Sequence, residues 1–147
     1  MPSADFSKLT AIIKTFQRPS ALDRLIRSIR RHYGDLRVVV ADDSPEPVSR
    51  DDVDVIELPG DVGLSAGRNA LLARVRTPYF LLLDDDLQLT GKTRIERLLA
   101  LAASDQLDIA AGTYLRCKRK FGLFVKKRPQ PYHGLLEVDG SELRLVE

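Results

Sequence analysis

Three consecutive aspartates, Asp84–Asp86, close the stretch YFLLLDDD at residues 79–86. The apolar residues before them are typical of a buried β-strand. Like charges at the end of such a strand repel one another, so the arrangement is costly unless a bound cation or hydrogen-bond donors lie beside it. The sequence therefore predicts positive charge at this point. A turn would need one such side chain and not three.

Two other apolar runs, at 9–16 and 36–44, also end in polar residues. In open α/β sheets, ligands bind outside the carboxyl ends of the strands, so all these side chains are expected at one rim. Carboxylate oxygens without a neighbouring His or Cys suit a hard divalent ion, Mg²⁺ or Mn²⁺. A cap or turn role remains an alternative for Asp42 and Asp43. The polar residues at the three strand ends are Lys14, Thr15, Arg18, Asp42, Asp43 and Asp84–Asp86.

The order of the elements that must position these residues predicts an α/β fold with a mostly parallel sheet flanked by helices. Ser20 with Asp23, and Ser65, are predicted to cap the first two helices. A C-terminal β-hairpin is expected to turn at Asp139-Gly140. Strands are predicted at 9–16, 36–44, 53–59 and 77–83, with strand-like segments at 107–115 and 121–125; helices are predicted from about 20 to Gly34, within 60–75, and from about 92 to 103.

Composition limits the possible classes of protein. The chain has 147 residues and a formal charge of +2, which fits one globular domain. A basic run at 116–128 is interpreted as the solvated edge of a hairpin, with contact to phosphates or an anionic membrane as the alternative. We expect no nucleic-acid partner, and a homo-oligomer is compatible with the open edges of a small sheet.

The single cysteine, Cys117, excludes an intrachain disulfide and favours a cytoplasmic location. No apolar run reaches the roughly 18 residues that a spanning helix needs. Membrane association is therefore expected only through segments outside this chain. A Golgi-lumenal fragment whose anchor has been removed is the alternative location.

Four motifs occur in order along the chain: AIIKTFQRP, VVVADDS, VGLSAGRNALL and YFLLLDDD. Together they resemble the nucleotide-sugar-binding half of inverting GT-A glycosyltransferases of the family-2 type, over about residues 9–116. KTFQRP, ADDS and GLSAGRN are similar to the β-1,4-N-acetylgalactosaminyltransferase branch. The resemblance implies one GT-A (Rossmann-like) domain over 1–147 without the acceptor-binding half. It also implies a UDP-N-acetylhexosamine donor, inversion, and a carbohydrate or glycoconjugate acceptor.

The resemblance implies roles for individual residues as well. Thr15 and Arg18 match the loop that lines the nucleotide, and Asp43 matches the acid that reads the uracil edge. The triple aspartate matches the DxD motif, in which Asp84 faces the ribose or sugar, and Asp84 and Asp86 are the candidate ligands of Mn²⁺ or Mg²⁺. A divalent ion there offsets the charge that grows on the leaving diphosphate. The remaining donor-binding candidates are Arg68, near the base or diphosphate, and Asp85.

The catalytic base has no recognisable motif in the sequence. Enzymes of this family supply an Asp or Glu from the acceptor-binding half, and the candidates here are Glu137 and Asp139, for which turn or surface roles are the alternative. A catalytically incomplete UDP-sugar-binding module, needing a partner or the missing half, is therefore the alternative function. A sugar nucleotidyltransferase fits less well, because KTFQRP has no glycine to cradle a triphosphate.

Overall fold

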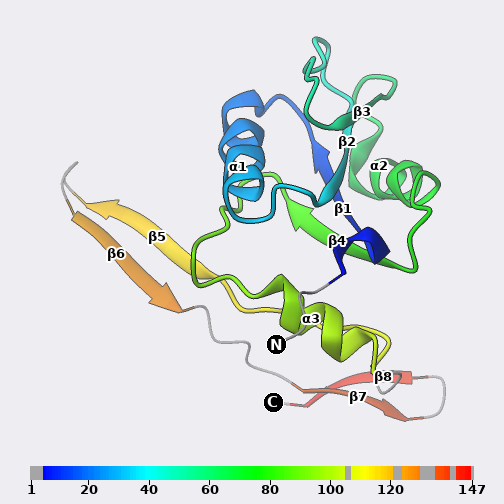
Figure 1. Ribbon diagram of the computed structural model, residues 1–147, viewed down its shortest axis with the longest axis vertical. Coiled ribbons are helices and arrows are strands. Elements are labelled where there is room, and N and C mark those ends of the chain that lie inside the picture. Colours follow the sequence, from blue (N-terminus) through cyan, green and yellow to red (C-terminus); the bar gives the residue numbers. More distant parts are fainter. Residues whose placement is uncertain (1–4, 105–106, 121–123, 130–134, 140–141, 147) are drawn as a thin grey trace. The chain divides into compact units, whose positions relative to one another are not determined.

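The computed structural model divides the chain into two units, Met1–Asp108 and Ile109–Glu147. The first unit contains a parallel sheet with the helices α1, α2 and α3, and the second contains two pairs of strands (Figure 1). The prediction of one domain over the whole chain stays a prediction. The described residues are 5–104, 107–120, 124–129, 135–139 and 142–146.

A four-stranded parallel sheet with the order β3-β2-β1-β4 forms the centre of the first unit. This confirms the predicted α/β class. The two inner strands, β1 and β2, are rich in Ile, Val and Ala and are buried on both faces, as parallel strands usually are. The bounds are β1 Leu9–Thr15, β2 Arg37–Asp42, β3 Asp54–Glu57 and β4 Tyr79–Asp84, and a short 3₁₀ helix, η1 Phe6–Lys8, precedes β1.

The register of the sheet brings the strand ends level with one another. Lys14 on β1 pairs with Ala41 on β2 and with Asp84 on β4. One residue further on, Thr15 pairs with Asp42. The segments that follow β1, β2 and β4 therefore start at the same edge of the sheet, where α/β proteins bind ligands.

Burial alternates along β4, which is an edge strand of the described sheet. Leu83 packs into the core, whereas Phe80 and Leu82 on the other face are exposed. The apolar run before the triple aspartate predicted a buried strand, and the structure buries β4 on one face only. The reason is that β4 has a strand on one side only within the described sheet, and no described helix covers its second face in the way that α2 covers β1 and β2.

The helices α1 and α2 cover opposite faces of the sheet (Figure 1). The apolar stripe of α1, Pro19–His32, is buried with one face of β1 and β2, as its spacing predicts. On the other face, Leu71 of α2, Gly63–Leu72, packs with Ile12, Val39 and Ala41. Successive strand residues point to opposite faces, so each inner strand supplies both cores.

Both predicted helix caps are wrong. No side chain caps α1, which starts at Pro19, a residue whose missing N–H needs no acceptor in the first turn. Ser20 therefore lies inside the helix, and Asp23 binds arginines instead. Ser65 likewise lies within α2, whose N-cap is Val62.

The third predicted helix is present as α3, Ile95–Ala102, and Ile95 is buried in the same core as α1. Within the described residues, no helix has both the length and the apolar character needed to span a membrane.

The second unit consists of antiparallel strand pairs, β5 with β6 and β7 with β8. Residues 107–114, predicted as strand-like, form no strand; this segment contains small residues that offer little surface for packing, and Ile109 is exposed. Residues 121–123 and Gly140 lie outside the described residues, so the hairpin turn at Asp139-Gly140 stays a prediction. The bounds are β5 Leu115–Lys120, β6 Phe124–Pro129, β7 Leu135–Asp139 and β8 Glu142–Val146.

Candidate functional site

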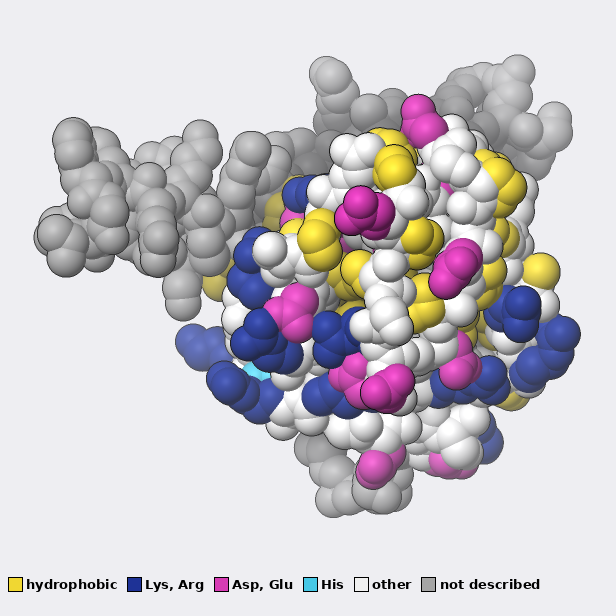
Figure 2. Space-filling view, turned by 90° about the horizontal axis from the view of Figure 1, so that it is seen from above, with side chains coloured by type: hydrophobic (Ala, Val, Ile, Leu, Met, Phe, Trp, Pro, Cys, Tyr) yellow, Lys and Arg dark blue, Asp and Glu magenta, His cyan; other side chains and the backbone are white. Residues whose placement is uncertain are grey.

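A cavity of about 460 Å³ lies at the carboxyl ends of β1, β2 and β4, and we call it the strand-end cavity. The turn before α2 and the first residues of that helix also line it, through Asp61, Gly63 and Leu64. Figure 2 views the molecule from the top of Figure 1 and shows acidic side chains beside Lys and Arg side chains on that face. Six of the predicted site residues line the cavity: Thr15, Arg18, Asp43, Asp84, Asp85 and Asp86.

Asp85 is the buried member of the triple aspartate. The hydroxyl of Thr15 donates to its Oδ2 at 2.8 Å, and Nη1 of Arg18 donates to its Oδ1 at 2.8 Å. Both of its oxygens are thus held by residues that follow or end β1. Asp85 fixes the β1 and β4 ends against each other, and its role is partly structural.

Arg18 also reaches Asp86, because its Nη2 donates to Oδ2 of that residue at 3.2 Å. The hydrogen bond to Asp86, together with the charge of Asp85, raises the pKa of Arg18. The positive charge that the sequence predicts beside the aspartates is therefore supplied in part by the chain itself. A second arginine contributes, since Nη2 of Arg68 on α2 donates to Asp84 at 3.1 Å.

Arg68 keeps unused donor capacity beside the cavity. Its Nε is buried and has no hydrogen-bond partner, while its terminal nitrogen binds Asp84. Arg68 is not among the residues that line the cavity, so the structure brings it to the border of the site through Asp84. This position is compatible with contact to a bound anion.

Asp43 is almost completely buried and forms an ion pair with Lys14. Burial acts to raise the pKa of Asp43, but the hydrogen bond and charge of Lys14 outweigh it and hold the pKa below its usual value. The backbone N–H of Gly63 adds a contact of 3.3 Å to Oδ2 of Asp43. Gly63 has φ = 84°, a conformation that favours glycine and starts α2 at this point.

Lys14 was not among the residues to which the sequence assigned a role. Its Nζ donates to Asp43 and, at 2.9 Å, to the carbonyl of Thr15. The signal in the sequence is a single charged residue inside an apolar strand, because a buried lysine is rare unless it is paired. The sequence could not identify the partner, which lies 29 residues away.

Asp42 takes the turn role that the sequence left open for the pair. It is not among the residues that line the cavity and binds the loop that follows it, accepting from the backbone N–H groups of Ser44 and Val48 at 2.9 Å each. The hydroxyl of Ser44 in turn accepts from the N–H of Gln17 at 2.7 Å. This contact joins the loop after β2 to the loop after β1, so both walls of the cavity are linked.

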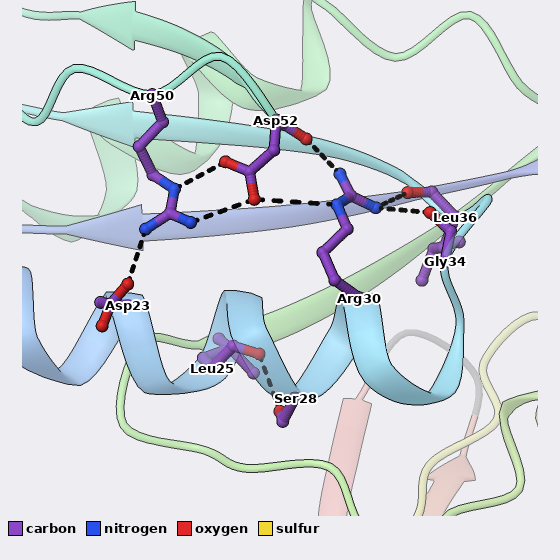
Figure 3. A network of polar contacts seen from close by, with 8 residues as sticks. All are labelled: Asp23, Leu25, Ser28, Arg30, Gly34, Leu36, Arg50 and Asp52. Carbon is purple, nitrogen blue, oxygen red and sulfur yellow. Dashed lines mark hydrogen bonds and ion pairs between the residues drawn. The ribbon is translucent and has the colours of Figure 1, made fainter.

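A polar network fastens the far end of the same loop to α1 (Figure 3). Arg50 donates to Asp52 at 2.8 and 3.0 Å and to Asp23 at 2.9 Å. Arg30 donates to the carbonyls of Asp52 and Leu36, the latter at 2.8 Å. The hydrogen bonds from Arg50 lower the pKa of Asp52, so the network favours the charged form.

Among the described residues, no group of three or more His, Cys, Asp or Glu side chains is arranged to hold a metal ion. The side chains of Asp84 and Asp86 are, however, 67% and 53% exposed at the cavity. Mg²⁺ and similar ions are usually held by one or two carboxylates together with substrate phosphates. The oxygen donors of Asp84 and Asp86 fit such an ion.

The two base candidates, Glu137 and Asp139, lie on β7 in the second unit, where they pair in register with Arg144 and Glu142. Their role as catalytic bases stays a prediction.

Fold and site together define a domain of the GT-A glycosyltransferase type. The family model described as "Glycosyl transferase family 2" matches residues 10–142, and the chain belongs to this family. It is 41% identical over 107 residues to mouse "Beta-1,4 N-acetylgalactosaminyltransferase 2", covering 71% of this chain and 21% of that protein. It is 43% identical over 106 residues to human "Beta-1,4 N-acetylgalactosaminyltransferase 1", covering 71% and 20%. These relatives confirm the predicted resemblance, and the chain spans about a fifth of their length.

The fold is also similar to two crystal structures of S. aureus TarS. For "TarS 1-349" the TM-score is 0.54 at 20% identity, covering 66% of this chain and 32% of that chain. For "TarS" the TM-score is 0.56 at 19% identity, covering 74% and 20%. At this identity the likeness concerns the fold.

Proposed function

We propose that the strand-end cavity binds the donor of a glycosyl transfer, a UDP-N-acetylhexosamine, and that the sugar is transferred with inversion to a carbohydrate or glycoconjugate acceptor. The observation that carries the proposal is the convergence of Thr15, Arg18, Asp43 and Asp84–Asp86 on one cavity. The similarity to two β-1,4 N-acetylgalactosaminyltransferases supports the choice of an N-acetylgalactosamine donor.

The base of the nucleotide is proposed to lie against Asp43. This carboxylate is buried at the floor of the cavity and is held by Lys14 and Gly63. An ionised carboxylate accepts hydrogen bonds only, which suits the N3–H of uracil. UDP should therefore bind better than CDP.

The diphosphate is proposed to lie beside Arg18 and Arg68, and the ribose and sugar beside Asp84 and Asp85. Arg18 is half exposed at the cavity, so its guanidinium can shift from Asp86 to a phosphate oxygen without leaving the site. A divalent ion held by Asp84 and Asp86, as Mn²⁺ or Mg²⁺, would supply Lewis-acid stabilisation of the leaving diphosphate.

A second candidate function is a UDP-sugar-binding module that does not transfer the sugar. The observation that favours it is that the predicted acids that line the cavity, Asp43 and Asp84–Asp86, are all assigned to the donor or the ion. General-base help contributes about 10²- to 10⁴-fold to a rate. Without a base and a positioned acceptor, the cavity would bind the donor and hydrolyse it slowly. A cytoplasmic location stays a prediction for either function.

The two candidates are separated by following UDP-N-acetylgalactosamine and UDP-N-acetylglucosamine with Mn²⁺ and a panel of sugar acceptors. Because no base has been assigned among its residues, we expect the 147-residue chain assayed alone to bind with at most slow hydrolysis, which is the outcome that the second candidate predicts. Turnover near the usual enzymatic range of about 1 to 10³ per second would establish transfer by these residues. Failure of both nucleotide sugars to bind would refute both candidates.

A further inference from the structure

We propose that Lys14 is a specificity-determining residue that acts through Asp43: it holds this carboxylate as a pure hydrogen-bond acceptor and thereby selects uracil over cytosine. The inference rests on the proposed function, in that the base of the donor is read by Asp43. It adds Lys14, a residue that the proposed function assigns neither to the diphosphate nor to the metal ion.

The geometry of the pair is that of a buried, closed contact. The side chains of Lys14 and Asp43 are 6% and 1% exposed. Nζ of Lys14 donates to Oδ1 of Asp43, and the N–H of Gly63 lies 3.3 Å from Oδ2. Both residues also line the strand-end cavity. Each oxygen of a carboxylate can accept a second hydrogen bond, so Asp43 can still accept one from a ligand in the cavity.

The stem of Lys14 is held in place along its length. A Cβ at Gly67 on α2 would lie 2.4 Å from both Cδ and Cε of Lys14, so only glycine lets the helix pass this close. Nζ lies 5.8 Å from the ring centre of Phe16 and donates to the carbonyl of Thr15 at 2.9 Å. The ammonium group is therefore directed at Asp43 by packing, and not by a flexible surface contact.

The protonation of Asp43 decides which base it matches. An ionised carboxylate offers acceptors only, and uracil presents the N3–H donor. A protonated carboxyl offers one donor beside one acceptor, and this is the pattern that matches the N3 acceptor and amino donor of cytosine. A buried hydrogen-bonding group discriminates strongly because the wrong base leaves it unsatisfied.

Lys14 is the group that opposes protonation. Burial acts to raise the pKa of Asp43, and the hydrogen bond and charge of Lys14 reverse this and lower it. Without the ammonium the effect of burial would be opposed less, and the carboxyl would take up a proton at a higher pH than in the native chain. The charged groups that share the cavity with the pair are Arg18, Asp61 and Asp84–Asp86, and apart from Arg18 they are acids that would also favour the protonated form.

The test is the ratio of UDP to CDP affinity between about pH 5.5 and 8.5, measured with Mn²⁺ for the native chain and for Lys14→Met. The native ratio should favour UDP by about tenfold or more and stay flat over this range. In Lys14→Met the ratio should fall several-fold and decline further as the pH is lowered. Lys8→Met removes an exposed lysine that lies 4.0 Å from Asp5 and should leave the ratio native.

Lys14→Gln provides a second variant, since an uncompensated buried carboxylate can unfold Lys14→Met. Glutamine still donates a hydrogen bond to Asp43 but carries no charge, so its ratio should also become dependent on pH. A native, flat ratio in these variants would overturn the inference, and so would an equal loss of UDP and CDP affinity at every pH. If neither variant folds, a decline of the UDP-to-CDP affinity ratio of the native chain towards pH 5.5 would also overturn the inference. Absence of any UDP preference in the native chain would instead refute the assignment of Asp43 in the proposed function.

Discussion

The aspartates after β2 and those after β4 look alike in the sequence and differ in the fold. Asp42 ends and Asp43 follows an inner strand of the sheet; both are buried, and their oxygens are bound by donors of the chain. Asp84 ends an edge strand and Asp86 lies two residues beyond it; both are exposed, each with one arginine contact. Asp85 is the buried exception among the three.

The position of a strand in the sheet therefore determines which role an aspartate at its end can take. An acid at the end of an inner strand must be satisfied by the protein, so it becomes an anchor or a rigid acceptor. An acid at the end of an edge strand stays solvated and keeps oxygens for a ligand. Substitutions after β2 should therefore act on stability or base selection, and those after β4 should act on the metal.

The largest effect on stability is expected for Asp42→Ala. This change leaves the N–H groups of Ser44 and Val48 without their acceptor, and hydrogen bonds to charged groups contribute about 1.5–3 kcal/mol. The free energy of unfolding should fall by about 3 kcal/mol in urea denaturation. Asp84→Ala is the matched control and should change it by less than about 0.5 kcal/mol. If the two variants are equally stable, the proposed difference between the aspartates at the ends of β2 and β4 is wrong.

Asp86→Ala should affect ligand binding and leave the fold intact. Loss of one carboxylate should weaken UDP binding in Mn²⁺ by at least about tenfold, since even outer-sphere changes cost that much in metal affinity. Calorimetry should show that the variant binds UDP equally in Mn²⁺ and in EDTA. If the variant keeps a native response to Mn²⁺, Asp86 is not a ligand.

The smallest effect is expected for Arg50→Met, which removes the contact of the loop after β2 with Asp23 on α1 but leaves the contact of Arg30 with that loop (Figure 3). The partly exposed ion pairs of Arg50 contribute little, so the melting temperature should fall by roughly 3–5 °C at neutral pH. Hydrogen bonds from Arg27 and then Arg50 lower the pKa of Asp23 to about 2. Because the pKa of Asp23 in the folded state lies below the ordinary 3.8, its ionised side chain stabilises the fold above about pH 4. This stabilisation is lost as the pH falls towards 2.

The melting temperatures of native chain and Arg50→Met should therefore converge between about pH 4 and pH 2. Arg37→Met is the control, because Arg37 binds the exposed Asp54 at 3.0 Å on the sheet and leaves the loop attached. A difference that stays constant down to pH 2 would show that Arg50 acts by packing alone.

The parallel sheet and the shared rim could be predicted from the sequence, because the apolar runs of β1 and β2 fix their burial and parallel strands end at one edge. The exposure of Phe80 could not be predicted, since it depends on whether another element covers that face of β4. The predicted cap of the first helix is wrong for a local reason: the helix starts at Pro19, whose missing N–H needs no acceptor, so Ser20 is not required as a cap.

Within the site, the sequence predicted which acids converge and missed what holds them. The contacts of Arg18 with Asp85, and of Lys14 with Asp43, join residues 67 and 29 positions apart. Such pairs depend on the sheet register and on the close approach of α2 at Gly67. Neither is visible from residue types in one sequence.

We propose that the strand-end cavity binds UDP with a divalent ion held by the exposed aspartates Asp84 and Asp86. This proposal is tested most directly by titrating the native chain with UDP by calorimetry, once in Mn²⁺ and once in EDTA. The account predicts clearly tighter binding in Mn²⁺ than in EDTA. Equal UDP affinity in the two titrations, or no UDP binding in either, would contradict it.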